Sequence, residues 1–112
     1  MSSGFIEPGL SSEALHIHRA LASLQEELEA IDYYHQRVDV STDASLQAVL
    51  AHNRDDEVEH AMMLLEWIRR AMPGFDVQMR KFLFQSGSLT DLAAGSVPAT
   101  SGAKGLGLGG LK

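Results

Sequence analysis

The sequence predicts an all-α protein whose main part is an antiparallel hairpin of two long helices. Two stretches, about residues 11–39 and 42–72, contain neither proline nor glycine and carry apolar residues at alternating spacings of four and three. That spacing places the apolar residues on one side of a helix that packs nearly parallel or antiparallel to another. The few residues between the stretches are typical of a short turn, so the two helices are expected to fold back on each other.

Composition limits the class of protein. The chain has 112 residues, 45% of them hydrophobic, and a formal net charge of −6. This length suits one small domain, and the negative charge argues against a nucleic-acid partner. Because there is no cysteine, disulfides, cysteine-zinc sites, iron–sulfur clusters and thiol catalysis are excluded. Met1 to Leu10 lacks the pattern of a signal peptide, and no apolar run approaches the ~18 residues of a membrane span, so we expect a cytoplasmic protein without membrane association.

The first helix carries one charged residue on its inward side. Residues 1–10 contain glycine and proline without periodicity, and are predicted to form a flexible N-terminal arm. Ser11 or Ser12 can cap the helix, which continues to about Asp39. Its inward-facing series is Ala20, Leu24, Glu27, Ile31, Tyr34 and Val38.

The second helix carries three polar residues on its inward side. Ser41 or Thr42 is predicted to cap it, with Asp43 in its first turn. It extends to about Met72, where Pro73-Gly74 ends it. The inward-facing series is Leu46, Leu50, Asn53, Glu57, His60, Leu64 and Trp67.

The C-terminal part has three predicted segments. A short third helix runs from Phe75 to about Gln85, which extends the helical domain over residues 11–90. Residues 91–104 have the composition of a flexible linker. In residues 105–112, three leucines stand among glycines. That pattern fits a docking peptide that becomes ordered on its partner, or a disordered tail whose leucines are incidental.

Glu57 and His60 form a Glu-x-x-His pair that can share a metal ion. Residues three apart on a helix lie on one face, ~5–6 Å from each other. The pair is half of what di-iron carboxylate bundles use: a Glu from each of two helices, and Glu-x-x-His from each of the other two. Glu27 lies at about the same depth, because it precedes the turn by nearly as many residues as the pair follows it. Burying unpaired carboxylates is costly, so a cation or a hydrogen-bond partner is expected there.

Two helices alone cannot close a core, so two copies are expected to pair into a four-helix bundle. A two-fold homodimer supplies two each of Glu27, Glu57 and His60, which completes a di-iron ligand set. Carboxylates with one imidazole per metal suit iron or manganese, and zinc can also bind. The Glu57 carboxylates would bridge the metals. Tyr34, seven residues from Glu27, either contacts this site or is an ordinary core tyrosine.

Residues 26–39, 51–61 and 65–70 resemble the encapsulated ferritins. The resemblance covers about residues 11–90, and residues 105–112 look like the peptide with which such cargo docks inside an encapsulin shell. It implies a ferritin-like four-helix bundle and a ring of five dimers. It also implies a di-iron ferroxidase centre at a dimer interface, and mineral storage inside the surrounding encapsulin nanocompartment.

The resemblance also assigns residues. Glu27, Glu57 and His60 match the ferroxidase ligands, and Tyr34 matches the neighbouring tyrosine. Glu26 and Glu29 match carboxylates that bind further metal on the way to the centre.

Three neighbours of these residues carry open interpretations. Without the resemblance, Glu26 and Glu29 would be interpreted as solvated charges on the helix surface. Tyr33 stands where the family pattern has tryptophan, which affects the surroundings of the site and none of the ligands. His52 flanks the inward-facing series beside Asn53 and is expected to hydrogen-bond within it rather than to bind metal.

The sequence therefore predicts an enzyme, a ferroxidase that oxidises Fe(II) to Fe(III) with O₂ or peroxide. Two alternatives stay open at this point. One is a non-catalytic helical cargo protein in which the same residues hold a structural zinc, calcium or manganese ion. The other is a helical oligomer without metal, in which Glu27, Glu57 and His60 form a satisfied hydrogen-bonded network.

Overall fold

The computed structural model describes residues 6–95, and all of its regular structure is helical within that range. The elements are α1 (Ser12–Val40), α2 (Ala44–Ala71), α3 (Pro73–Phe82) and α4 (Leu89–Ala94). The chain divides into two compact units, Met1–Ala71 and Met72–Lys112. The prediction of an all-α fold built on two long helices is confirmed. None of the described helices is long and apolar enough to cross a membrane.

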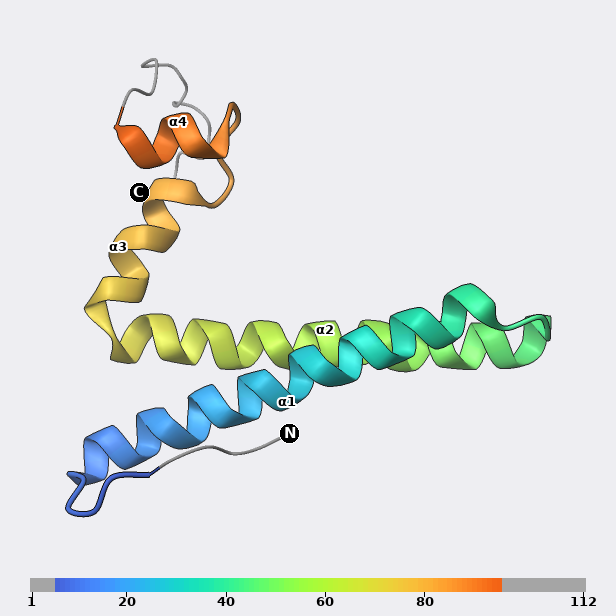
Figure 1. Ribbon diagram of the computed structural model, residues 1–112, viewed down its shortest axis with the longest axis horizontal. Coiled ribbons are helices and arrows are strands. Elements are labelled where there is room, and N and C mark those ends of the chain that lie inside the picture. Colours follow the sequence, from blue (N-terminus) through green and yellow to red (C-terminus); the bar gives the residue numbers. More distant parts are fainter. Residues whose placement is uncertain (1–5, 96–112) are drawn as a thin grey trace. The chain divides into compact units, whose positions relative to one another are not determined.

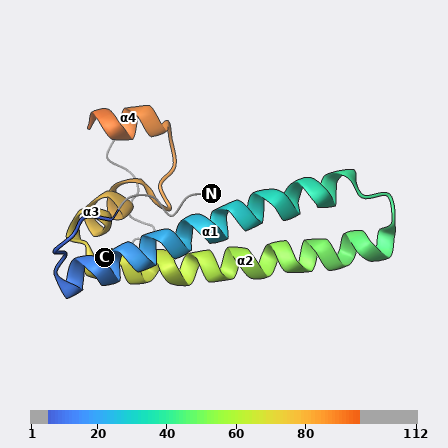
Figure 2. The ribbon, with the colours of Figure 1, turned by 60° about the horizontal axis from the view of Figure 1, so that its bottom comes forward.

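The first unit is an antiparallel hairpin in which α1 and α2 lie side by side (Figure 1, Figure 2). The helices have 29 and 28 residues. At a rise of 1.5 Å per residue each is about 42–44 Å long, so residues equally distant from the turn face each other along the whole hairpin. This register sets the level at which residues of α1 meet residues of α2.

Side chains cap the N-terminal ends of both long helices. Ser11 caps α1, as predicted, by accepting a hydrogen bond from the backbone N–H of Ala14 at 3.0 Å. The cap of α2 is Asp43, whose Oδ1 accepts from the backbone N–H of Leu46 at 3.0 Å. The expectation that Ser41 or Thr42 caps this helix was therefore wrong, since the carboxylate one position later takes the orphan N–H.

The buried positions of the hairpin differ in part from the predicted series. Ala20, Ala61 and Ile68 are its buried residues within the described range. On α2 the deepest line therefore passes through Ala61 and Ile68, one position beyond the expected His60 and Trp67. The side chain of His60 is 48% exposed, and Trp67 is 44% exposed. Spacing fixes the period of an apolar stripe but not its centre, because α2 carries apolar residues on more than one side.

The exposed side of α2 is unusually apolar for a helix in water. Its half-exposed large side chains are Leu46 (51%), Val49 (55%), Val58 (41%), Met62 (50%), Met63 (60%) and Trp67 (44%). Exposed apolar groups that gather on one element mark an interaction surface more often than chance. The hairpin therefore retains the unburied apolar surface that the sequence predicts for two helices without partners.

The second unit contains α3 and α4. Pro73 is the first residue of α3, so Pro73-Gly74 begins this helix as well as ending α2. Proline suits that position because its missing N–H is not needed there. The predicted third helix is thus confirmed, with bounds two to three residues earlier than expected.

The helix α4 was not predicted. Ser88 caps it by accepting from the backbone N–H of Asp91 at 3.3 Å, and Gly95 ends it in the left-handed conformation with φ 77°. Leu92, 4% exposed, anchors the helix. The helix includes residues 91–94, the start of the stretch expected as a linker. Residues 96–104 of that stretch, the docking peptide 105–112 and residues 1–5 of the expected arm lie outside the described residues.

Candidate metal centre

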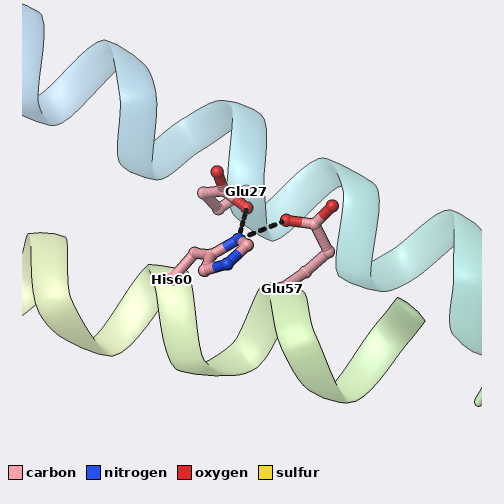
Figure 3. Close-up of side chains that lie close together, drawn as sticks. All are labelled: Glu27, Glu57 and His60. Atoms are coloured by element: carbon pink, nitrogen blue, oxygen red, sulfur yellow. Dashed lines mark hydrogen bonds and ion pairs between the residues drawn. The ribbon is translucent and has the colours of Figure 1, made fainter. Parts of the chain in front are cut away.

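Three side chains from the two long helices converge midway along the hairpin. Glu27 comes from α1, and Glu57 and His60 come from α2 (Figure 3). Each offers one donor atom, and the three donor atoms lie within 4.8 Å of one another. The helices bring together the three residues that were expected to meet. Their role as metal ligands stays a prediction.

The contacts within this group centre on the imidazole. The Nδ1 atom of His60 lies 3.2 Å from Oε1 of Glu57 and 3.8 Å from Oε1 of Glu27. The first distance is a hydrogen bond and the second an ion-pair distance only. Nδ1 is thus the common partner of two carboxylate oxygens. A cation could take over this role.

The site is open on one side. The side chains of Glu27 and Glu57 are 26% and 25% exposed, whereas that of His60 is 48% exposed. The carboxylates are therefore held between the helices, and the imidazole lies toward solvent. One hairpin thus leaves coordination positions open for further ligands.

The two carboxyl groups share protons unequally. A hydrogen bond with Glu57 and, after it, burial raise the pKa of Glu27 above its usual 4.5. The same hydrogen bond, with help from His60, lowers the pKa of Glu57 below 4.5. Two carboxyl groups can hydrogen-bond only when one is protonated. Glu57 is therefore the more acidic carboxyl group of the pair, and Glu27 is the one that more readily accepts a proton.

His60 favours its charged form. Its hydrogen bond with Glu57 is the largest cause that raises its pKa above 6.5, and the charge of Glu27 adds to the shift. The cluster thus favours a positive charge beside its carboxyl groups, and a metal ion bound there would compete with the His60 proton.

One atom of the cluster lacks a partner. Oε1 of Glu27 is buried with no hydrogen-bond partner among the described residues. With Glu27 ionised, this oxygen would be a buried acceptor left unpaired, which costs about 1–3 kcal/mol or more. A cation bound by the three donors would remove that cost. The donor set of two carboxylates and one imidazole, without sulfur, fits iron, manganese or zinc.

The remaining predicted site residues lie outside this cluster. Tyr34 is half-buried and packs under the guanidinium of Arg37, whose Cζ is 5.5 Å from the ring centroid. In the described part of the chain no hydrogen bond joins Tyr34 to the three donors. Glu26 is exposed and contributes only a like charge that raises the pKa of Glu27.

Glu29 and Tyr33 form a pair of their own. The Tyr33 hydroxyl donates to Oε2 of Glu29 at 2.9 Å, and this hydrogen bond raises the pKa of Tyr33 above 10. Arg37 also lies over the Tyr33 ring, at 5.9 Å. Tyr33, which stands where the family pattern has tryptophan, therefore hydrogen-bonds to Glu29, one of the two carboxylates that were expected to bind further metal.

Two further interactions of the hairpin were not predicted. Arg54 reaches from α2 to α1, with Nη1 3.3 Å from Nδ1 of His35. Because a guanidinium only donates, the imidazole nitrogen accepts in this contact. Arg69 and Arg70 hold Glu66 through hydrogen bonds of 2.8 and 2.7 Å and lower its pKa to about 2. Their i+3 and i+4 spacings from Glu66 were the available signals.

Contrary to expectation, His52 does not hydrogen-bond within the inward-facing series among the described residues but pairs at the surface, where its side chain is 75% exposed. Its Nε2 lies 3.3 Å from Oδ2 of Asp56, one helical turn away. Neither residue belongs to the three-donor cluster. His52 therefore serves as a matched control for experiments on His60.

Comparisons with known proteins agree on one family. A model described as EncFtn-like matches residues 6–86 of the chain. An encapsulated ferritin-like protein of Rhodospirillum rubrum is 52% identical over 85 residues, which are 76% of this chain and 61% of that protein. A ferritin-like protein of Thermotoga maritima is 53% identical over 74 residues, which are 66% of this chain and 65% of that protein. The chain thus spans somewhat less than two thirds of the length of these curated relatives.

A solved structure shows the same fold. It is a crystal structure of a protein from Nitrosomonas europaea, 53% identical in sequence, with a TM-score of 0.74. The match covers 77% of this chain and 97% of that chain.

Proposed function

The chain belongs to the EncFtn-like family, and from that premise we propose that it is a ferroxidase whose di-iron site is completed by a second copy. The observation that carries the proposal is the cluster of Glu27, Glu57 and His60, with donor atoms within 4.8 Å of one another. Iron is the substrate. Two Fe(II) ions each give up one electron to an oxidant such as O₂ and leave as Fe(III).

One chain offers half of a di-iron ligand set. Such sites take two lone Glu residues and two Glu-x-x-His pairs from four helices, and this hairpin offers one of each from two helices. A two-fold partner doubles them. The half-exposed His60 and the apolar side chains exposed on α2 support such a pairing, because they leave the site and the hairpin incomplete in one copy.

The residues have distinct proposed roles. Glu57, the carboxylate with the lowered pKa, is ionised at neutral pH and can bridge two metal ions. At each metal ion, one Glu27 and one His60 are the terminal ligands. Protons compete with the metal for both residues, because their pKa values are raised. Tyr34, Glu26 and Glu29 remain candidates for a neighbouring redox residue and for further metal sites.

Aerobic oxidation of Fe(II), followed by absorbance, tests the proposal. The wild type is expected to oxidise Fe(II) well above a protein-free blank, and His60→Ala and Glu27→Ala are expected to fall to the blank because each removes a ligand. His52→Ala is the matched control, since it removes an exposed imidazole from the same helix. Metal binding without oxidation in the wild type would instead indicate a structural zinc, calcium or manganese site.

We further propose that residues 105–112 dock the protein inside an encapsulin shell. Support comes from their sequence and from the name of the Rhodospirillum rubrum relative as an encapsulated protein. Co-expression with a shell protein tests this. Deleting residues 105–112 is expected to abolish loading of the shell and to leave Fe(II) oxidation intact. If oxidation were lost too, the assignment of separate roles to tail and hairpin would be wrong.

A further inference from the structure

We propose that His35 is a positioning residue, which holds the guanidinium of Arg54 away from Glu57 and so keeps this carboxylate available to a metal ion. The inference rests on the proposed ferroxidase activity and deepens it, because it adds a residue on which access of iron to that site depends. The observations that carry it are the contact of Arg54 with His35 and the position of Arg54 one helical turn before Glu57.

Arg54 stands where it could pair with Glu57. Both residues lie on α2, three positions apart, and both are half-buried. This spacing places two side chains ~5–6 Å apart on one face of a helix, where opposite charges form ion pairs. A guanidinium can hold a carboxylate through two parallel hydrogen bonds. Arg54 therefore competes with a metal ion for Glu57 unless another contact keeps it elsewhere.

This competition differs from that of a proton. The proton that His60 favours can leave when a metal ion binds. A guanidinium keeps its charge at every pH at which the protein is folded, so it cannot give way by losing a proton. It has to move out of the site as a whole. Where Arg54 rests in the metal-free hairpin therefore affects how readily the centre accepts iron.

The structure holds the guanidinium at a different place. Nη1 of Arg54 lies 3.3 Å from Nδ1 of His35 on α1, and Nε lies 3.0 Å from Oδ1 of Asp55. Within the described residues Arg54 makes no hydrogen bond or ion pair with Glu57. Because the two contacts use different nitrogens of one planar group, they fix its orientation as well as its position.

His35 is the more important of these two partners. Asp55 is the next residue on α2 and its side chain is 68% exposed, so this ion pair alone is worth little. His35 belongs to the other helix and directs the guanidinium toward α1. The contact lies between the two helices of one hairpin, so it does not depend on which outer face a second copy covers.

Anaerobic titration of the full chain with Fe(II), followed by calorimetry, tests the inference. His35→Leu removes the acceptor at an exposed position, and we expect its affinity for Fe(II) to fall about threefold to fivefold as Arg54 turns to Glu57. His35→Gln offers an amide oxygen as acceptor and should retain the affinity. His52→Leu, which removes an exposed imidazole from α2, is the matched control. All proteins are compared in the same oligomeric state.

Arg54→Gln distinguishes competition from a general loss of structure. Combined with His35→Leu, it should restore the affinity, because the competing cation is gone. By itself it should change the affinity much less, since His35 already holds Arg54 away. A loss that persists in the double variant would overturn the inference. An equal gain with and without His35 would also overturn it, because it would report only the removal of a positive charge.

Aerobic Fe(II) oxidation by the same samples provides a second readout. His35→Leu is expected to raise KM for Fe(II) and to leave kcat unchanged, because saturating iron displaces Arg54 from Glu57. A fall in kcat at unchanged KM would mean that the three donors themselves are disturbed, and would contradict a positioning role.

These measurements separate the inference from the proposed function. Equal Fe(II) affinity in the wild type and in His35→Leu would remove the role of His35 and leave the ferroxidase standing. A wild type that neither binds nor oxidises Fe(II) would remove the ferroxidase and this inference with it.

Discussion

At the scale of single residues, Glu57 organises the metal centre. It accepts a hydrogen bond from His60 and is the largest cause of the raised pKa of both Glu27 and His60. Without metal, the proton that His60 favours supplies a positive charge beside it. With metal, the same lone pairs become ligands, so protons and cations compete for one set of atoms.

This competition predicts the pH dependence of metal binding. As pH falls through the raised pKa of His60, the imidazole gains a proton and can no longer bind a metal ion. Affinity for anaerobic Fe(II), measured by calorimetry, is therefore expected to be highest near pH 8 and to fall steeply toward pH 5.5. An affinity that is constant over this range would mean that His60 is not a ligand.

The metal-free protein should show the opposite trend. A raised folded-state pKa means that the contribution of His60 to stability is fully present below pH 6.5 and is lost as pH rises through the folded value. The thermal midpoint in the presence of a chelator should therefore decrease from pH 6 to pH 8. His60→Gln should flatten this decrease and serves as the control, because the other histidines still titrate in it.

At the scale of the elements, the turn sets the level at which α1 meets α2. Gln47 Nε2 donates to the carbonyl oxygen of Val38 across this turn at 2.7 Å. Glu27 and Glu57 face each other because they lie at similar distances from it. A slip of one helix along the other by a single turn, 5.4 Å, would separate the donor atoms.

The cap of α2 gives a test of this part of the fold. Asp43→Ala removes the acceptor for the backbone N–H of Leu46 and is expected to lower the free energy of unfolding by about 1 kcal/mol. Chemical denaturation measures it. Thr42→Ala, one position earlier and exposed, should change stability by less than about 0.5 kcal/mol. If Thr42→Ala lost more stability than Asp43→Ala, the cap would be Thr42, one of the two residues that the sequence suggested.

At the scale of the whole molecule, the sequence predicted the helices and the three converging residues better than it predicted which side chains of α2 are buried. Glu27, Glu57 and His60 follow from helix period and distance to the turn, both of which are local quantities. The burial of Ala61 and Ile68, in place of His60 and Trp67, depends on how α2 rotates against α1. Period alone leaves that rotation free, since apolar residues such as Met62 and Met63 lie on the other sides of the helix.

Other differences have equally local causes. Residues 89–94 are too short a segment to show a period, so α4 follows from its cap at Ser88, its end at Gly95 and the anchoring of Leu92. The contact of Arg54 with His35 joins residues of two helices, and their spacing along the chain does not predict it.

The central claim is that a complete iron-oxidising site needs two copies of the hairpin. The most direct test is the rate of aerobic Fe(II) oxidation per chain, measured on single chains and on assemblies separated by size-exclusion chromatography, beside Glu57→Ala of known oligomeric state. We predict rapid oxidation by assemblies of the wild type, and rates at the protein-free blank for its single chains and for the variant. Single chains that oxidise iron as fast per chain as the assemblies would contradict the claim, because one hairpin would then hold the whole site.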